Sequence, residues 1–228
     1  LKDRPFQTRY KMELDGENTR IHDHKTGEAL PLSHERVRVV FPSMGLYSTQ
    51  AMTAIASQNG FQAEYLPTVD QSAIHLARSV SSGKECIPTL IVLGAMLKMQ
   101  AEDPPAEDEV LAFLVPKTTG PCRTGQYAPY YERTFADLGI DNVAIMNLNS
   151  DNGYMELGAM FNKLAWYALV LGDYFKDMEL SLRILAVDKK AAMAEFRDIW
   201  AGVVQMLGDD ITKLYDHLEN VALPRLQA

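Results

Sequence analysis

The two cysteines are the residues best suited to chemistry, and they occur in matching settings. Cys122 lies in the motif GPCRTGQY, after an apolar run at Val110–Val115 and before a helical pattern. Cys86 lies in the motif SGKECIP, where Pro88 fits only the first turn of a helix that continues through Leu90–Met99. The sequence therefore predicts that both cysteines stand at glycine-marked starts of helices.

Such a position favours the thiolate form of a cysteine. Backbone N–H groups are unpaired at the start of a helix, and the helix dipole is positive there. Arg123 follows Cys122 directly, and Lys84 precedes Cys86 by two residues, so each thiol also has a cation nearby. Gly83 and Gly120 mark the two loops.

Three uses of the pair are open from the residues alone. Free cysteines are commonly small buried apolar residues. A redox dithiol is a second use, although the chain contains no C-x-x-C motif. The third is ligation of an iron–sulfur cluster, with backbone N–H groups tuning the cofactor. A cubane cluster needs four ligands, so a second copy, another part of the protein or a non-protein ligand would have to supply the rest.

Composition limits the class of protein. With 228 residues, 47% of them hydrophobic, the chain can bury one core and a small annex. A net charge of −8 argues against a nucleic-acid partner, and no apolar run approaches the roughly 20 residues that a membrane span requires. Two cysteines make no disulfide framework, so we expect a cytoplasmic protein. Because the chain starts at Leu1 in mid-pattern, we expect a segment of a longer protein.

Apolar strands alternate with helical patterns along the middle of the chain. The expected strands are Arg36–Phe41, Phe61–Leu66, Val110–Val115 and Asn142–Leu148. The expected helices are Leu46–Gln58, Gln71–Val80, one starting near Cys86 and one following Cys122. This alternation predicts an α/β fold with an open, mainly parallel sheet of about four strands, Rossmann-like or flavodoxin-like. The dinucleotide signature GxGxxG is absent from the sequence.

This topology predicts where the cysteines lie. In a βαβ unit the helix runs antiparallel to the strands, so its N-terminus lies at their carboxyl edge. Cys122 starts the helix after the third strand, and Cys86 starts the last helix before that strand. We therefore expect both at the edge where open α/β folds build their sites.

The α/β domain, residues 35–153, is expected to lie between two further segments. Residues 1–34 predict a polar hairpin with strands Tyr10–Leu14 and Thr19–His24. The pattern of residues 154–228 predicts a helical region. Its many methionines and wide apolar face suggest a surface that a partner covers. Its core is expected to include the aromatic residues Trp166, Tyr167, Phe196 and Trp200.

Two stretches carry a resemblance to a known family. SGKECIP followed by TLIVLGAML, and GPCRTGQYAPYYERTFADLGI with NSDNGY, resemble the activase-related proteins of the 2-hydroxyacyl-CoA dehydratase system over about Val37–Tyr154. Long chains of that family join ATPase domains to segments of this kind, and related dehydratase subunits carry cysteine-ligated clusters, three cysteines to each. The resemblance places the family's GKEC cysteine on Cys86 and its GPCR cysteine on Cys122.

The resemblance implies an iron–sulfur-linked electron-transfer segment of an ATP-driven activase or dehydratase-like system. Cys86 and Cys122 would be the metal ligands, and Lys84, Arg123, Gly83 and Gly120 would surround the cofactor. ATP would be bound only by domains outside this segment, since the chain has no phosphate-binding ATPase motif and no complete catalytic set. The expected partners are ATPase domains of the same longer protein or a dehydratase-like subunit.

The alternative function is a non-catalytic binding or docking module. In that case the sheet edge would recognise an anionic ligand, such as a CoA or nucleotide phosphate, and the helical region would bind partner domains.

The shortage of cysteine ligands for a cluster suggests a homodimer. A two-fold axis would bring four thiolates together, two from each chain.

Overall fold

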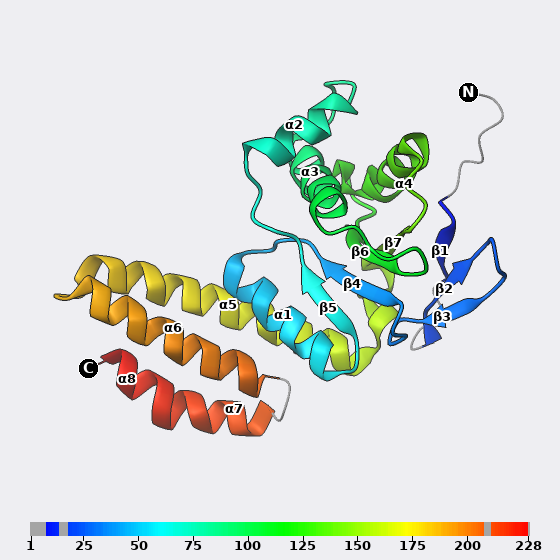
Figure 1. The fold of residues 1–228 in the computed structure, drawn as a ribbon. Coiled ribbons are helices and arrows are strands. Elements are labelled where there is room, and N and C mark those ends of the chain that lie inside the picture. Colours follow the sequence, from blue (N-terminus) through cyan, green and yellow to red (C-terminus); the bar gives the residue numbers. More distant parts are fainter. Residues whose placement is uncertain (1–7, 14–17, 208–210, 228) are drawn as a thin grey trace. The chain divides into compact units, whose positions relative to one another are not determined.

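The computed structural model describes residues 8–13, 18–207 and 211–227 (Figure 1). Within it the chain divides into two compact units. The sheet unit comprises the chain up to Ser43 together with Phe61–Asn162. The helical unit comprises Met44–Gly60 together with the chain from Lys163 onward.

The strands of the sheet unit form two separate sheets. They are β1 (Tyr10–Glu13), β2 (Arg20–Asp23), β3 (Ala29–Pro31), β4 (Val37–Phe41), β5 (Gln62–Tyr65), β6 (Val110–Lys117) and β7 (Val143–Asn149). The first three pair antiparallel in the order β1-β2-β3, and the other four pair in parallel in the order β5-β4-β6-β7. The predicted α/β fold with a parallel sheet of four strands and an N-terminal hairpin is confirmed.

Strand β6 is central to the parallel sheet. Its residues from Val110 to Val115 are all buried, the pattern of a strand covered on both faces. On one side Ala112 lies opposite Val39 of β4, and on the other it lies opposite Ala144 of β7. The uninterrupted apolar run that marked this strand in the sequence thus reflects its central place.

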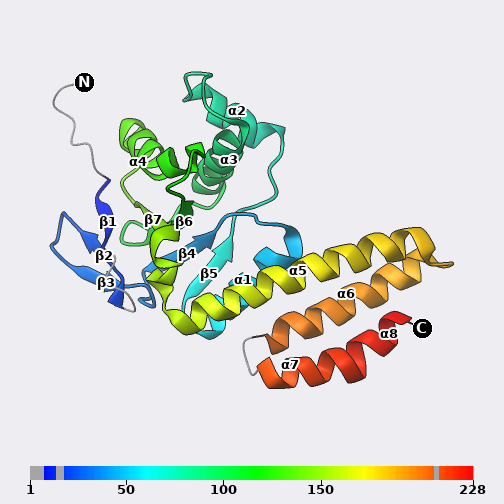
Figure 2. The same cartoon turned by 180° about the vertical axis from the view of Figure 1, so that it is seen from behind.

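Helices cover one face of this sheet (Figure 2). They are α2 (Gln71–Ser79), α3 (Ile87–Glu102) and α4 (Tyr127–Leu138), with the short 3₁₀ helices η2 (Arg123–Gln126), η3 (Ser150–Asn152) and η4 (Met155–Leu157) along the chain. Phe113 of β6 stacks on Phe135 of α4 with 6.0 Å between ring centroids. Leu93 and Met96 of α3 are buried in the same core. This packing fixes α3, which starts at Cys86, and α4, which follows Cys122 through the short helix η2.

The N-terminal sheet has a strand that the sequence analysis did not predict. Tyr10 pairs with Asp23, as the hairpin predicts, and β3 then adds along the other side of β2. β3 is only three residues long and ends at Pro31, so it shows no alternation that could identify it. The segment that joins the two predicted strands, residues 14–17, lies outside the described residues.

The helical unit is not continuous in sequence, because α1 (Leu46–Gln58) belongs to it. The other helices are α5 (Ala159–Leu185), α6 (Lys189–Met206), α7 (Ile211–His217), the π-helical turn η5 (Leu218–Ala222) and α8 (Leu223–Gln227). Tyr47 of α1 packs edge-on against Trp200 of α6, with 5.0 Å between ring centroids. None of the described helices combines the length and apolar character needed to cross a membrane.

Aromatic residues form the core of the helical unit, but not all of the expected ones take part. Phe196 and Trp200 are buried, and both pack against Phe175. Trp166 and Tyr167 are instead 54% and 47% exposed, so their expected core role is wrong. The apolar residues of α5 extend around more of the helix than its packed face, and sequence periodicity alone does not separate the two sets.

α5 crosses α1 at a glycine that leaves no room for a side chain. A Cβ atom on Gly172 would lie 2.6 Å from the Cα atom of Ser48 and would also meet the backbone nitrogen of Ser48. Gly202 in α6 offers a contrast, because its Cβ would approach nothing nearer than His217 Nε2 at 3.6 Å.

We therefore predict opposite effects of the same substitution at these two positions. Gly172→Ala should lower the free energy of unfolding by about 1–3 kcal/mol, since the backbone of α1 must move. Gly202→Ala should leave stability unchanged or raise it by up to about 1 kcal/mol, because alanine favours a helix. Urea titration followed by circular dichroism measures both. Equal effects of the two variants would show that the α1–α5 crossing has room to adjust.

Candidate functional site

Cys86 stands at the N-cap of α3, as its place before Pro88 predicts. The loop before it turns at Gly83, whose φ of +80° favours glycine. Glu85 Oε1 accepts hydrogen bonds from the backbone nitrogen of Ser82 at 3.0 Å and from its hydroxyl at 2.9 Å. Burial alone would raise the pKa of Glu85, but the hydrogen bonds from Ser82 and the loop backbone hold it at about 2. The loop is therefore closed by an ionised carboxylate.

The Cys86 sulfur lies between two hydroxyl groups. It is 3.0 Å from Thr89 Oγ1 and 2.8 Å from Tyr127 Oη. The hydrogen bond with Thr89 and then that with Tyr127 lower the pKa of this half-buried thiol, with a smaller contribution from the charge of Arg123. Burial and the neighbouring sulfur raise the pKa of Tyr127, so its hydroxyl keeps the proton that it donates. The arrangement stabilises a thiolate at Cys86.

Cys122 stands at the start of η2, which leads directly into α4. Its exposed sulfur lies 3.0 Å from Thr124 Oγ1. Hydrogen bonds from the hydroxyl and then the backbone of Thr124 lower the pKa of Cys122, while the charge of Cys86 opposes this effect. The Cys86 sulfur therefore lies close enough to raise the pKa of Cys122 slightly.

The two cysteine loops are joined directly. Arg123 Nη1 donates a hydrogen bond of 3.0 Å to the backbone carbonyl of Lys84. One turn into the helices, Tyr131 Oη donates to the carbonyl of Thr89 at 3.1 Å. Because α4 follows β6 and α3 precedes it, both loops lie at the carboxyl edge of the parallel sheet. We call this region, with Cys86 and Cys122 at its centre, the cysteine edge.

The other expected site residues also lie at the cysteine edge. Lys84 and Arg123 are exposed and form no ion pair with the described residues. Gly120 has open space around it, since a Cβ there would meet no atom within 4 Å. Gly125, which was not predicted to belong to the site, is the glycine of this loop that leaves no room for a side chain. A Cβ added there would lie 2.7 Å from the carbonyl oxygen of Thr118.

The hydroxyl groups that contact the sulfurs were not predicted from the sequence. Thr89 is three residues after the N-cap Cys86, and Thr124 is two residues after Cys122. A hydroxyl within the first turn after a capping cysteine is a signal that could have identified both. Tyr127 belongs to the helical pattern that follows Cys122, and only the packing of α3 beside α4 brings its hydroxyl to Cys86.

Several buried oxygen atoms at this edge lack hydrogen-bond partners among the described residues. Thr118 Oγ1 directly follows β6, and Asn147 Oδ1 lies near the end of β7. Tyr130 Oη is a third such atom, and burial and then the nearby charge of Glu85 raise the pKa of Tyr130. Buried polar atoms without partners are rare in folded proteins, so each one calls for an explanation. They are acceptors and donors that a ligand or water could use.

The thiols are the metal-binding groups that this edge offers. Within residues 8–13, 18–207 and 211–227, no group of three or more histidine, cysteine or acidic side chains is placed to hold a metal ion. The chain has two cysteines in all. Two thiolates fit half of the four-sulfur set of an iron–sulfur cluster, and the other half would have to come from outside this chain.

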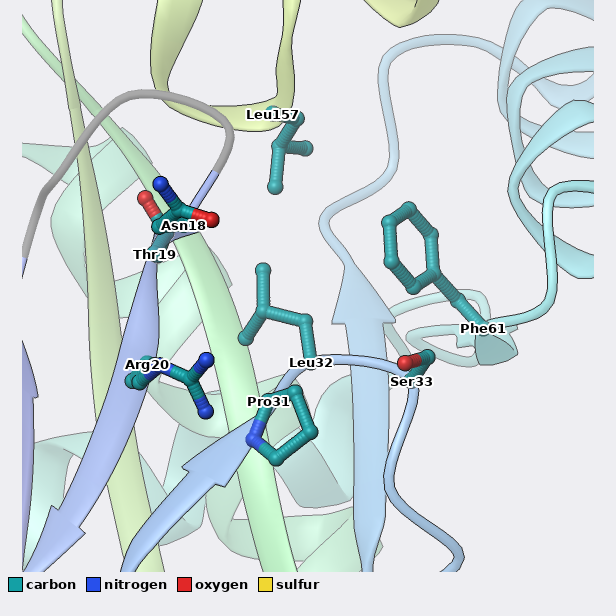
Figure 3. A pocket seen from close by; sticks show the side chains of 8 residues that line it. All are labelled: Asn18, Thr19, Arg20, Pro31, Leu32, Ser33, Phe61 and Leu157. Carbon is teal, nitrogen blue, oxygen red and sulfur yellow. The ribbon is translucent and has the colours of Figure 1, made fainter.

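A small pocket of the sheet unit is separate from the cysteines (Figure 3). It measures about 160 Å³ and is lined by Asn18, Thr19, Arg20, Pro31, Leu32, Ser33, Phe61 and Leu157. Arg20 is the only titratable residue among these, so the lining offers no pair of titratable groups for proton transfer. The residues come from four separate segments of the chain, and no sequence pattern indicated them.

Comparisons with known proteins identify no relative. No protein-family model, curated protein or solved structure matches this chain.

The hydroxyl contacts predict a change in thiol reactivity. Tyr127→Phe removes a donor to the Cys86 sulfur, so the pKa of Cys86 should rise and its alkylation at neutral pH should slow. The rate of iodoacetamide reaction against pH, measured in a Cys122→Ser background, gives this pKa. Tyr130→Phe removes a nearby hydroxyl that does not contact the sulfur and should leave the profile unchanged. Identical profiles for the two tyrosine variants would contradict the proposed role of Tyr127.

Proposed function

We propose that the cysteine edge holds an iron–sulfur cluster, and that the chain serves electron transfer in an ATP-driven activase or a dehydratase-like system. The observation that supports this most is the pair of thiols with lowered pKa values at adjoining helix starts. The resemblance of both cysteine motifs to activase-related proteins agrees with it.

The residues present suit such a cofactor as half of its ligand set. Cys122 is exposed and Cys86 is half-buried, so neither thiol is sealed in the core. Thiolates are the ligands that iron–sulfur clusters use. A second copy of the chain would add two more thiolates if a two-fold axis passed near the cysteine edge.

The neighbouring groups have separate roles in this proposal. Thr89, Tyr127 and Thr124 donate hydrogen bonds to the sulfurs, and such bonds tune the reduction potential of a bound cluster. Arg123 and Lys84 place positive charge beside the sulfurs and offset the negative charge of the thiolates. When bound, the cluster supplies one-electron transfer.

The alternative is a docking module that recognises an anionic ligand at the same edge. The exposed cations Arg123 and Lys84, close to two helix starts, favour it. This alternative needs the cations rather than the sulfurs. The two functions can therefore be separated by changing one set of residues at a time.

Anaerobic reconstitution with iron and sulfide tests the proposal. We predict uptake of about two iron atoms per chain, with four thiolates holding one four-iron cluster between two chains. Cys86→Ser and Cys122→Ser should each abolish the brown colour and the EPR signal of the reduced protein. Sedimentation should show a dimer after iron uptake.

Tyr130→Phe serves as the matched control at the same edge. It should retain iron, because it removes no sulfur and no contact to a sulfur. Failure of the wild-type chain to take up iron would contradict the proposal for this chain. A monomer with a complete cluster would contradict the shared site. Iron uptake that persists in both cysteine variants would exclude the thiols as ligands.

A further inference from the structure

The helical unit contains a pocket whose charged lining is entirely positive. It measures about 350 Å³ and is formed by Arg183, Lys189, Lys190, Met193 and Arg197. These residues come from the end of α5 and the first half of α6, which lie side by side (Figures 1 and 2). We call it the basic pocket. In a chain with a net charge of −8, four cations around one pocket are a local reversal of charge.

Helix geometry explains how the α6 residues come together. Lys190, Met193 and Arg197 are spaced by three and four positions, so they share one face of the helix. Met193 is largely buried and supplies an apolar wall between the two cations. Arg183 lies on the neighbouring helix and completes the pocket.

The acidic residues of α6 do not neutralise these cations. Glu195 and Asp198 are both bound by Arg225 of α8. Among the described residues Lys190 and Arg197 form no ion pair. The acidic residues of α6 thus form their ion pairs with α8, and its basic residues remain unpaired around the pocket within the described part of the chain.

Arg183 is held in place by a buried carboxylate. Its Nε and Nη2 atoms donate to Glu179 Oε1 at 3.1 and 2.7 Å, which leaves Nη1 outside this ion pair. Glu179 is also bound by Lys176 at 2.8 Å. With Lys176, Glu179 and the α6 N-cap residue Asp188 included, the surroundings of the pocket still carry an excess of three positive charges.

A bound anion would relieve the repulsion among these cations, which is modest in its absence because their side chains are exposed and salt screens them. Arginine side chains suit phosphate oxygens, since the guanidinium group presents paired donors in one plane. A volume of about 350 Å³ lies at the lower end of the range for small-molecule sites, about 300–1,000 Å³. It suits a phosphate or diphosphate group better than a complete nucleotide.

We propose that the basic pocket binds a small, multiply charged phosphate anion, namely a diphosphate or the terminal phosphates of a phosphorylated small molecule. The proposal is independent of the cysteine edge, because it uses none of that site's residues. It therefore stands or fails separately from the proposed electron transfer.

Isothermal titration calorimetry of the full chain tests it, with pyrophosphate and ADP as probes at about 0.15 M ionic strength. Pyrophosphate should bind one site per chain with a Kd of about 1 mM or below. The double variant Lys190→Gln/Arg197→Gln should weaken binding by at least about tenfold, since it removes two charge-assisted donors. Circular dichroism verifies that the variant is folded.

Arg78→Gln/Lys163→Gln is the matched control, because it removes two exposed cations that do not line the pocket. The affinity of this control variant for pyrophosphate should stay within about twofold of that of the wild type. ADP binding equal to that of pyrophosphate indicates that the phosphate chain alone is recognised, and tighter ADP binding indicates a nucleotide as the source.

Three results would overturn the proposal. The first is no heat of binding with either probe. The second is an equal loss of affinity in the control variant, which would indicate attraction to overall charge. The third is displacement of pyrophosphate by a poly-glutamate peptide that binds more tightly, which would assign the pocket to an acidic protein segment instead.

Discussion

The parallel pairing of β6 between β4 and β7 is the constraint on which the cysteine edge depends. β6 is buried along both faces from Val110 to Val115, so a slip of one residue against its neighbours would exchange the side chains of the two faces. The register in turn fixes where β6 ends and where the loop to α4 begins. Since α3 returns to the start of the same strand, one pairing pattern positions both helix starts. Two cysteines that are 36 positions apart in sequence thereby come to adjoining loops.

Short-range hydrogen bonds, rather than formal charges, dominate the electrostatics of the two thiols. Thr89 and Tyr127 lower the pKa of Cys86 more than Arg123 does. Thr124 is likewise the principal cause of the lowered pKa of Cys122. The guanidinium of Arg123 is bound to the carbonyl of Lys84, so it acts first as a tie between the loops. This arrangement suits a site that must keep its thiols ionised while facing water, because exposed charges are screened by salt and hydrogen bonds are not.

The sequence predicted the parts of this molecule that depend on local rules. The bounds of α1 and the N-cap position of Cys86 follow from nearby glycine, asparagine and proline residues. These residues start or end a helix through effects that reach only about one turn along the chain. The contact between Tyr127 and Cys86 depends on how α3 and α4 pack, and the exposure of Trp166 depends on which face of α5 is covered. The basic pocket combines residues of two helices, so single-helix periodicity could not reveal it. Long-range packing, absent from any local pattern, decides each of these.

The membership of α1 in the helical unit has a consequence for synthesis of the chain. Gln50 accepts a hydrogen bond from Trp200 Nε1, its partner across 150 positions. A ribosome adding about 5–20 residues per second needs roughly 8–30 s to make that stretch. During this time the apolar side of α1 has left the ribosome without the aromatic residues that later cover it. The nascent chain therefore has a window in which α1 is a target for chaperones or for aggregation, whereas the strands on either side of it can already begin to pair.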